Sequence, residues 1–261
     1  MQVYKFIHSY LILPYSSLSG KSLNLLKKLF YCNIKRLKNL NIMNTNSKAK
    51  RILCYGDSNT WGWVPSGMGM KRHSIKERWT GILQKLLGEN YEIIEEGLAG
   101  RTTMFDDPRP EFPERNALKT LPIILETHLP LDLVILMLGT NDTKEMFKLS
   151  TEKITKGIQK LVRTIKAHKI LEGTSAPKIL IVVPPIIDET TDFASNLFKG
   201  GYKKTKDLVV SYKKLAENED VLYINPNTEI KVDEEEGIHI DITNHKKLAE
   251  LIYEAMKLWK K

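Results

Sequence analysis

From Arg51 onward, short apolar segments alternate with longer amphipathic segments. Segment 131–138 is apolar at all positions but one, as expected for a strand covered on both faces. The amphipathic segments repeat their apolar residues at helical spacing, and 79–87 is a clear example. The predicted strands are 52–55, 91–95, 131–138, 178–183 and 221–224, and the predicted helices are 79–87, 115–128, 151–171, 207–217 and 243–260.

This alternation predicts one α/β domain whose parallel sheet is covered by helices on both faces. For five strands we expect the doubly wound order 2-1-3-4-5, in which the first strand lies between the second and the third. The loops after these three strands then meet at the point where open sheets bind ligands. Those loops contain Ser58, Gly100 and Asn141, so we expect these residues to lie close together.

The formal net charge of +9 does not belong to this domain. Residues 1–51 contain ten of the 40 basic residues and no acidic residue, which leaves 30 basic and 31 acidic residues in the remainder. The body of the chain is therefore nearly neutral, and its charge gives no support for nucleic-acid binding. We expect no nucleic-acid partner.

We divide the chain into a basic N-terminal extension, 1–48, and an α/β domain, 49–261. The extension is open to three interpretations: a targeting or membrane-surface segment, a partner-binding arm, or a stretch that is not translated. We favour the third, because Met43 opens a polar stretch that leads directly into the first predicted strand.

Composition excludes two classes of protein. No apolar run reaches the ~18 residues that a membrane-spanning helix requires, so no integral membrane segment is expected. The two cysteines, Cys32 and Cys54, are too few for a disulfide-stabilised secreted fold or for a zinc site with several cysteines. We expect a cytoplasmic protein, with targeting through the extension left open, and Cys54 as a core residue.

Four residues can together perform one kind of chemistry: Ser58, Gly100, Asn141 and His239. A serine at a strand-to-helix turn offers a hydroxyl and its own N–H, a glycine offers an unobstructed N–H, and an asparagine amide offers two more. Three such donors around one point form an oxyanion hole. His239 supplies a base, and Glu236, three residues earlier, can orient the imidazole and stabilise its protonated form.

These residues resemble the sequence blocks of the SGNH (GDSL-type) hydrolases, and longer matches across 50–260 resemble the bacterial arylesterase/acyltransferase subgroup. The blocks are Gly-Asp-Ser at 56–58, Gly100, Gly-Thr-Asn-Asp at 139–142 and Glu-Gly-Ile-His at 236–239. The resemblance implies a flavodoxin-like three-layer sandwich. It also implies a serine esterase that hydrolyses short-chain or aryl carboxylic esters through an acyl-serine, with acyl transfer to alcohols as a further activity.

Carried over to this chain, the resemblance implies that Ser58 is the nucleophile, His239 the general base and Glu236 the acid of a catalytic triad. The oxyanion donors would be the N–H groups of Ser58 and Gly100 and the side-chain amide of Asn141. We expect a small-molecule ester as the partner, no cofactor and no metal.

The acid is the position that departs most from the family pattern. The family usually has aspartate three residues before the histidine, and this chain has Glu236 there. A glutamate can fill the same role, although its additional methylene must be accommodated. Three neighbouring acids are alternatives at this stage: Asp233, Glu234 and Glu235.

Several residues near the blocks have predicted supporting roles. Asn59 follows the nucleophile where many relatives have leucine, and we expect it to make the mouth of the substrate pocket more polar. At least one of Trp61 and Trp63 is expected to line that pocket. Asp57 and Asp142 are expected to hold their loops by hydrogen bonds rather than to react.

Other functions and arrangements stay open at this stage. One is a carbohydrate or cell-wall O-deacetylase of the same fold, and another is a non-catalytic flavodoxin-like module that holds a ligand with the same loops. Such a module predicts a phosphate loop after the first strand, whereas Trp61 and Trp63 suit an acyl group better. A homo-oligomer is also left open. His245 is expected on the exposed face of the last helix.

Overall fold

The computed structural model describes residues 44–65, 70–168 and 175–258, so most of the predicted extension, 1–48, lies outside the described residues. Asn46–Lys261 form a compact unit of their own. The strands of its parallel sheet are β1 (Lys50–Gly56), β2 (Tyr91–Gly97), β3 (Leu133–Met137), β4 (Lys178–Val182) and β5 (Leu222–Ile224). Their order is β2-β1-β3-β4-β5, which confirms the predicted order 2-1-3-4-5.

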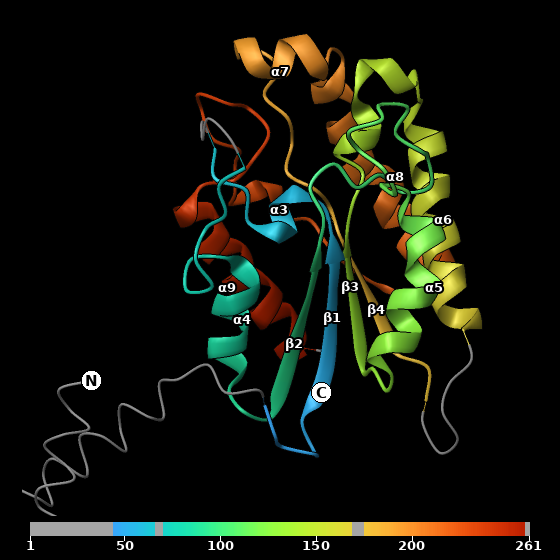
Figure 1. Cartoon of the computed structure of the whole chain (residues 1–261), viewed down its shortest axis with the longest axis vertical. Helices are drawn as coiled ribbons and strands as arrows, with labels where there is room; N and C mark the ends of the chain where they lie inside the picture. The colour runs from blue at the N-terminus through green and yellow to red at the C-terminus, as the bar shows by residue number, and fades with distance from the viewer. Residues whose placement is uncertain (1–43, 66–69, 169–174, 259–261) are drawn as a thin grey trace, which may run out of the picture. The chain divides into compact units, whose positions relative to one another are not determined.

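Helices cover both faces of this sheet, which confirms the predicted three-layer α/β architecture. Figure 1 shows α4 and α9 on one face and α5, α6 and α8 on the other. The described α-helices are α3 (Ser58–Trp61), α4 (Trp79–Leu87), α5 (Ala117–His128), α6 (Thr151–Ala167), α7 (Asp192–Leu197), α8 (Gly201–Glu219) and α9 (Ile242–Leu258). Short 3-10 turns are η2 (Asn141–Thr143), η3 (Glu145–Phe147) and η4 (Pro226–Thr228).

The helices differ from the predicted ranges where the apolar spacing is weak. α6 ends at Ala167 rather than at 171, because His168 adopts an extended backbone conformation. α8 begins at Gly201 rather than at 207, and the residues that its first turns bury, Gly201 and Thr205, are small. α3 and α7 have four and six residues, too few to show a helical period in the sequence.

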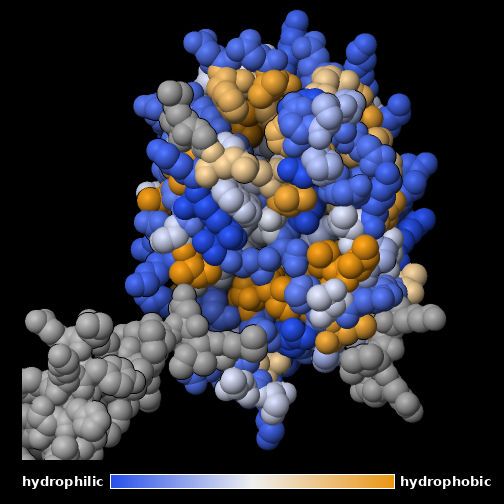
Figure 2. All heavy atoms as spheres, in the orientation of Figure 1, coloured by the Kyte–Doolittle hydropathy of each residue, from blue (hydrophilic) through white to orange (hydrophobic). Residues whose placement is uncertain are grey.

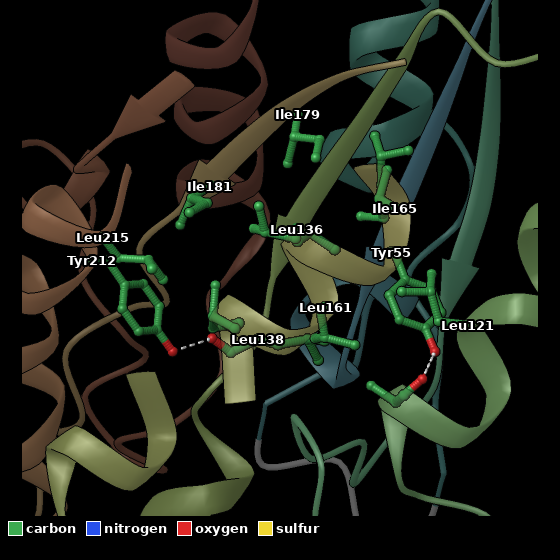
Figure 3. Packing of buried hydrophobic residues seen from close by; sticks show 14 of the residues in the cluster. Tyr55, Leu121, Leu136, Leu138, Leu161, Ile165, Ile179, Ile181, Tyr212 and Leu215 are labelled. Atoms are coloured by element: carbon green, nitrogen blue, oxygen red, sulfur yellow. Dashed lines mark hydrogen bonds between the residues drawn. The ribbon is translucent and has the colours of Figure 1, made fainter. Parts of the chain in front are cut away.

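Alternate residues of the strands supply two separate cores. On β1, Leu53 and Tyr55 pack in the core that includes residues of α5, α6 and α8, whereas Ile52 and Cys54 pack in the core that includes residues of α4 and α9. All four are at most 1% exposed, as expected for a central parallel strand, and Cys54 is the predicted core residue. Figure 3 shows the first core, where the Tyr212 hydroxyl donates to the carbonyl of residue 138 at 3.1 Å.

The register of the sheet aligns the ends of three strands. Gly56, the last residue of β1, pairs with Gly97 at the end of β2 and with Met137 at the end of β3. The loops that follow therefore leave the sheet side by side. α3 packs closely on this edge. A Cβ at Gly97 would lie 2.2 Å from the backbone nitrogen of Trp61, so only glycine fits at this position.

The surface of the domain is mixed in character. On the face drawn in Figure 2, hydrophobic residues form separate groups between hydrophilic ones. Large hydrophobic side chains that are exposed include those of Ile123 on α5 and Val210 on α8. In the described ranges, no helix combines the length and the apolar character needed to cross a membrane.

We propose that the domain folds without the N-terminal extension. A chain that starts at Met43 is expected to have the same melting temperature as the full chain, because the described residues of both cores and the aligned loops come after Lys50. Circular dichroism at 222 nm during heating measures this. A shortened chain that is insoluble or melts at a lower temperature would show that the extension stabilises the domain.

Candidate active site

Ser58 lies where β1 turns into α3. Gly56 ends the strand, and the Asp57 side chain caps the helix by accepting the N–H of Asn59 at 3.0 Å. Ser58 is the first residue of α3 and is 5% exposed. Asp57 therefore braces the turn as predicted, and the serine stands at the carboxyl edge of the sheet.

The Ser58 hydroxyl contacts a histidine from the far end of the sequence. Its Oγ lies 2.7 Å from Nε2 of His239, and Nδ1 of His239 lies 2.8 Å from both carboxylate oxygens of Glu236. All three residues are buried, and hydrogen bonds are electrostatically stronger in such surroundings than in water. The structure thus brings together the predicted serine, base and acid, and Glu236 is the acid that contacts the imidazole.

Backbone contacts hold the segment that carries Glu236 and His239. The Asp233 N–H donates to the His239 carbonyl at 2.7 Å, and Asp233 Oδ1 accepts the Glu236 N–H at 3.0 Å. Gly237 has a φ of +80°, and a Cβ there would lie 2.2 Å from the Asp188 carbonyl oxygen, so glycine is required. The carboxylate of Asp233 therefore holds the backbone of Glu236, and the carboxylate that contacts His239 is that of Glu236.

Asn59 ties the nucleophile's turn to the segment around His239. Its Oδ1 accepts the Ile240 N–H at 3.0 Å, and its Nδ2 donates to the Ile238 carbonyl at 3.4 Å. The residue is 1% exposed. The Asn59 amide therefore bonds the backbone on both sides of His239. We expected this residue to make the mouth of the substrate pocket more polar, and its contacts show a different role.

The two tryptophans after the nucleophile have different surroundings. The Trp63 ring stacks on the His239 ring, with centroids 5.4 Å apart and planes 22° from parallel. Trp61 lies next to Trp63, with 6.0 Å between the ring centroids, and the guanidinium of Arg72 lies 5.2 Å from the Trp61 ring. Trp63 therefore borders the imidazole, whereas Trp61 is covered by an arginine.

The predicted oxyanion donors have N–H groups that the protein does not use. Within the described ranges, the backbone N–H groups of Ser58 and Gly100 donate to no protein acceptor. The Asn141 amide donates one hydrogen bond to the Arg101 carbonyl at 3.1 Å, which leaves its second N–H available. Gly100 has a φ of +84°, which glycine adopts readily. The three donors come from the loops after three adjacent strands.

Side chains fasten these loops to one another. The Asp142 carboxylate accepts the Thr103 N–H at 3.0 Å and the Thr103 hydroxyl at 2.5 Å, so it holds its loop as predicted. Arg101 donates to the carbonyl of Gly56 at 2.8 Å and also to that of Glu96. Burial raises the pKa of Asp142 to about 7, against the hydrogen bonds from Thr103, which lower it.

His245 is fully buried, so the expectation of an exposed position is wrong. It shares the inner side of α9 with Leu248 and Ile252, and its Nδ1 accepts the Trp79 N–H at the start of α4 at 3.4 Å. Burial lowers the pKa of His245 to about 3, and the neighbouring His73 acts in the same direction. The spacing of residues 245, 248 and 252 is that of an inner helical face.

Lys144 has no predicted role, although it lies close to the predicted donors. It follows η2 directly, and its N–H donates to the Asn141 carbonyl at 3.3 Å. It is 5% exposed, whereas lysine side chains are rarely this buried. The only signal in the sequence is its position three residues after Asn141.

Comparisons with known proteins agree with this geometry. The sequence model of the GDSL-like Lipase/Acylhydrolase family matches residues 54–241. The structure of an aryl esterase from M. smegmatis superposes with a TM-score of 0.75 and a sequence identity of 42%. The match covers 80% of this chain and 99% of that chain. A carbohydrate acetylesterase from Sinorhizobium meliloti is 39% identical with a TM-score of 0.76, again over 80% and 99%. The comparison with curated proteins found no match.

The fold and the matched structures define an enzyme that hydrolyses ester bonds. The family match spans most of the chain, and the chain belongs to the GDSL-like lipase/acylhydrolase family. The resemblance to the SGNH (GDSL-type) hydrolases that the four sequence blocks indicate is thereby confirmed.

The raised pKa of Asp142 predicts a pH-dependent stability. The folded state holds the proton of this carboxyl more tightly than the unfolded state, in which the ordinary value of 3.8 applies. Asp142 therefore contributes stability that is complete below about pH 4 and is lost as the pH rises through about 7. Urea titrations measure the unfolding free energy of wild type and of Asp142→Asn. We expect the wild-type value minus the variant value to decrease as the pH rises from 5 to 8.

A matched control for this prediction is Glu126→Gln, which neutralises an exposed acid on α5. The corresponding difference in unfolding free energy is expected to stay flat over the same pH range. A flat or rising difference for Asp142→Asn would show that this carboxyl is ionised throughout and that burial does not dominate its titration.

Proposed function

We propose that this enzyme hydrolyses short-chain or aryl carboxylic esters through an acyl-serine on Ser58. The observation that carries the proposal is the continuous series of hydrogen bonds from Ser58 Oγ through His239 to Glu236. A serine hydroxyl is a weak nucleophile until an adjacent base takes its proton. At 2.7 Å, Nε2 of His239 is within range of that proton.

In the first half of the proposed reaction, Ser58 Oγ attacks the ester carbonyl carbon while its proton moves to Nε2 of His239. The carboxylate of Glu236 accepts a hydrogen bond from Nδ1–H and stabilises the imidazolium that forms. The same imidazolium then protonates the departing alcohol, and the acyl group remains on Oγ. In the second half, water attacks the acyl carbon while His239 takes the proton of the water. The bond from that carbon to Ser58 Oγ then breaks, the imidazolium returns the proton to Oγ, and the acid leaves with the serine and the neutral histidine restored.

The tetrahedral intermediates carry a negative oxygen, and three donors would stabilise it. We assign this role to the N–H groups of Ser58 and Gly100 and to the second amide hydrogen of Asn141. Their unused N–H groups and their fastened loops support the assignment. Losing one such donor typically lowers the rate by ~10²–10³.

Two observations bear on the substrate. The similarity to the aryl esterase of M. smegmatis and the position of Trp63 against His239 favour an aryl or small acyl ester. The similarity to the carbohydrate acetylesterase of Sinorhizobium meliloti favours removal of acetyl groups from carbohydrate as a second candidate. Acyl transfer would follow if an alcohol replaced water in the second half of the reaction.

The test uses 4-nitrophenyl esters from acetate to palmitate, together with an acetylated xylan. Wild type is expected to favour the short acyl chains, and Ser58→Ala to lose activity by ~10⁴-fold or more, because the covalent route is gone. Ser195→Ala, which alters an exposed serine on α7, is the matched control. Activity that survives in Ser58→Ala, or a preference for palmitate, would contradict the proposal. Faster release of acetate from xylan than from the aryl ester would select the second candidate.

The acid can be tested separately. Glu236→Gln is expected to lower kcat by ~10²–10⁴ with little rise in KM, because its contact with His239 strengthens as the imidazolium forms. Glu236→Asp is expected to keep substantial activity. Asp233→Asn is the control, since asparagine retains the Oδ1 that accepts the Glu236 N–H. A crippled Asp233→Asn with an active Glu236→Gln would assign the acid to Asp233 instead.

A further inference from the structure

In the described part of the chain, the ammonium group of Lys144 forms no ion pair. Throughout the described ranges, no acceptor is within hydrogen-bond distance of its Nζ and no carboxylate is within ion-pair distance. The aromatic ring of Phe198 lies near it, with 5.8 Å between Nζ and the ring centroid. This distance is within the range of cation–π attraction, which is much weaker than a buried ion pair.

The charged end of Lys144 stays accessible. Some side-chain nitrogen and oxygen atoms in the described ranges are completely enclosed and form no hydrogen bond, for example Nε1 of Trp79. Nζ of Lys144 does not belong to this group. Since this Nζ also lacks a hydrogen bond, the 5% of the residue that is exposed includes the ammonium. A small ligand could therefore reach the charge.

Among the described residues, no neighbouring acid forms a direct ion pair with this ammonium. Asp107 has a fully enclosed side chain and is bound by Arg109, with contacts of 2.6 and 2.8 Å. Burial raises the pKa of Asp57, and it raises that of Asp142 to about 7. Burial, and then the positive charge of Arg109, lower the pKa of Lys144 to about 8, although the nearby carboxyl groups of Asp107, Asp57 and Asp142 act in the opposite direction. Most of Lys144 is still protonated at pH 7.

Contacts of Lys144 connect it to the turn of one proposed oxyanion donor and, through Phe198, to the segment of the proposed base. On one side its backbone is part of the turn that begins at Asn141. On the other side, Phe198 packs in a small apolar cluster with Ile238, the residue directly before His239. The backbone of Lys144 therefore belongs to the turn of a proposed oxyanion donor, and its ammonium lies near a ring that packs with the residue before the proposed base.

We propose that Lys144 is a specificity-determining residue that binds a carboxylate carried by the ester substrate. The inference rests on the proposed function and names its substrate class, esters that carry an anionic group. The carboxylate would supply the direct ionic partner that Lys144 lacks among the described residues, through a charge-assisted hydrogen bond in partly desolvated surroundings.

The test uses two pairs of esters whose members differ in charge but hardly in shape. Mono-4-nitrophenyl adipate, with 4-nitrophenyl adipamate as its neutral partner, carries the carboxylate on the acyl side. The second pair, 4-acetoxybenzoate and 4-acetoxybenzamide, carries it on the alcohol side. For each pair we divide kcat/KM of the anionic ester by kcat/KM of its neutral partner. We expect Lys144→Met to lower this ratio by about tenfold or more in one pair, mainly because KM for the anionic ester rises. The pair that responds identifies the side.

The matched control is Lys203→Met, which removes the same charge from an exposed lysine that pairs with Asp207. It is expected to leave both ratios as in wild type. Unchanged ratios in Lys144→Met for both pairs would overturn the inference. Failure of wild type to hydrolyse 4-nitrophenyl acetate would instead contradict the proposed function.

Two further measurements keep the test independent of one substitution. Lys144→Gln is expected to lower the same ratio if Lys144→Met does not fold. In wild type, benzoate is expected to inhibit hydrolysis of 4-nitrophenyl acetate competitively and more strongly than the neutral benzamide does. Equal inhibition by the two compounds would overturn the inference without any variant.

Discussion

The hydrogen bond between Ser58 Oγ and His239 Nε2 joins residues 181 positions apart, and the rest of the site depends on it. The turn after the central strand β1 positions one partner, and the segment before α9 positions the other. Asn59 connects the two directly, because its amide bonds the backbone on both sides of His239. The residue next to the serine thus sets the place of the histidine, and a change at Asn59 would displace the base.

The other loops at this edge are held by buried polar groups. Asp142 binds Thr103 across two loops, and Arg101 binds carbonyls of two strands. Donors fixed in this way need little reorganisation when negative charge develops beside them. Lys144, buried beside the turn of Asn141, forms no ion pair among the described residues, and the substrate selectivity that we propose for it depends on this.

Much of this arrangement could be predicted from the sequence. Continuous apolar strands and glycine-ended loops indicate the sheet order, and the spacing of Glu236 and His239 indicates the acid and base. α3 and α7 are too short to show a period. The burial of His245 could have been predicted, since it falls on the apolar stripe of α9. The contacts of Asn59 could not, because they join segments that only the folded chain brings together.

The central claim is that Ser58 is the nucleophile, and covalent trapping tests it most directly. Wild type is treated with an aryl organophosphonate, and the intact mass and the modified peptide are measured. One adduct per chain on Ser58, with parallel loss of activity and no adduct in Ser58→Ala, is the predicted result. An adduct of the same stoichiometry that persists in Ser58→Ala, or that maps to another residue, would contradict the claim.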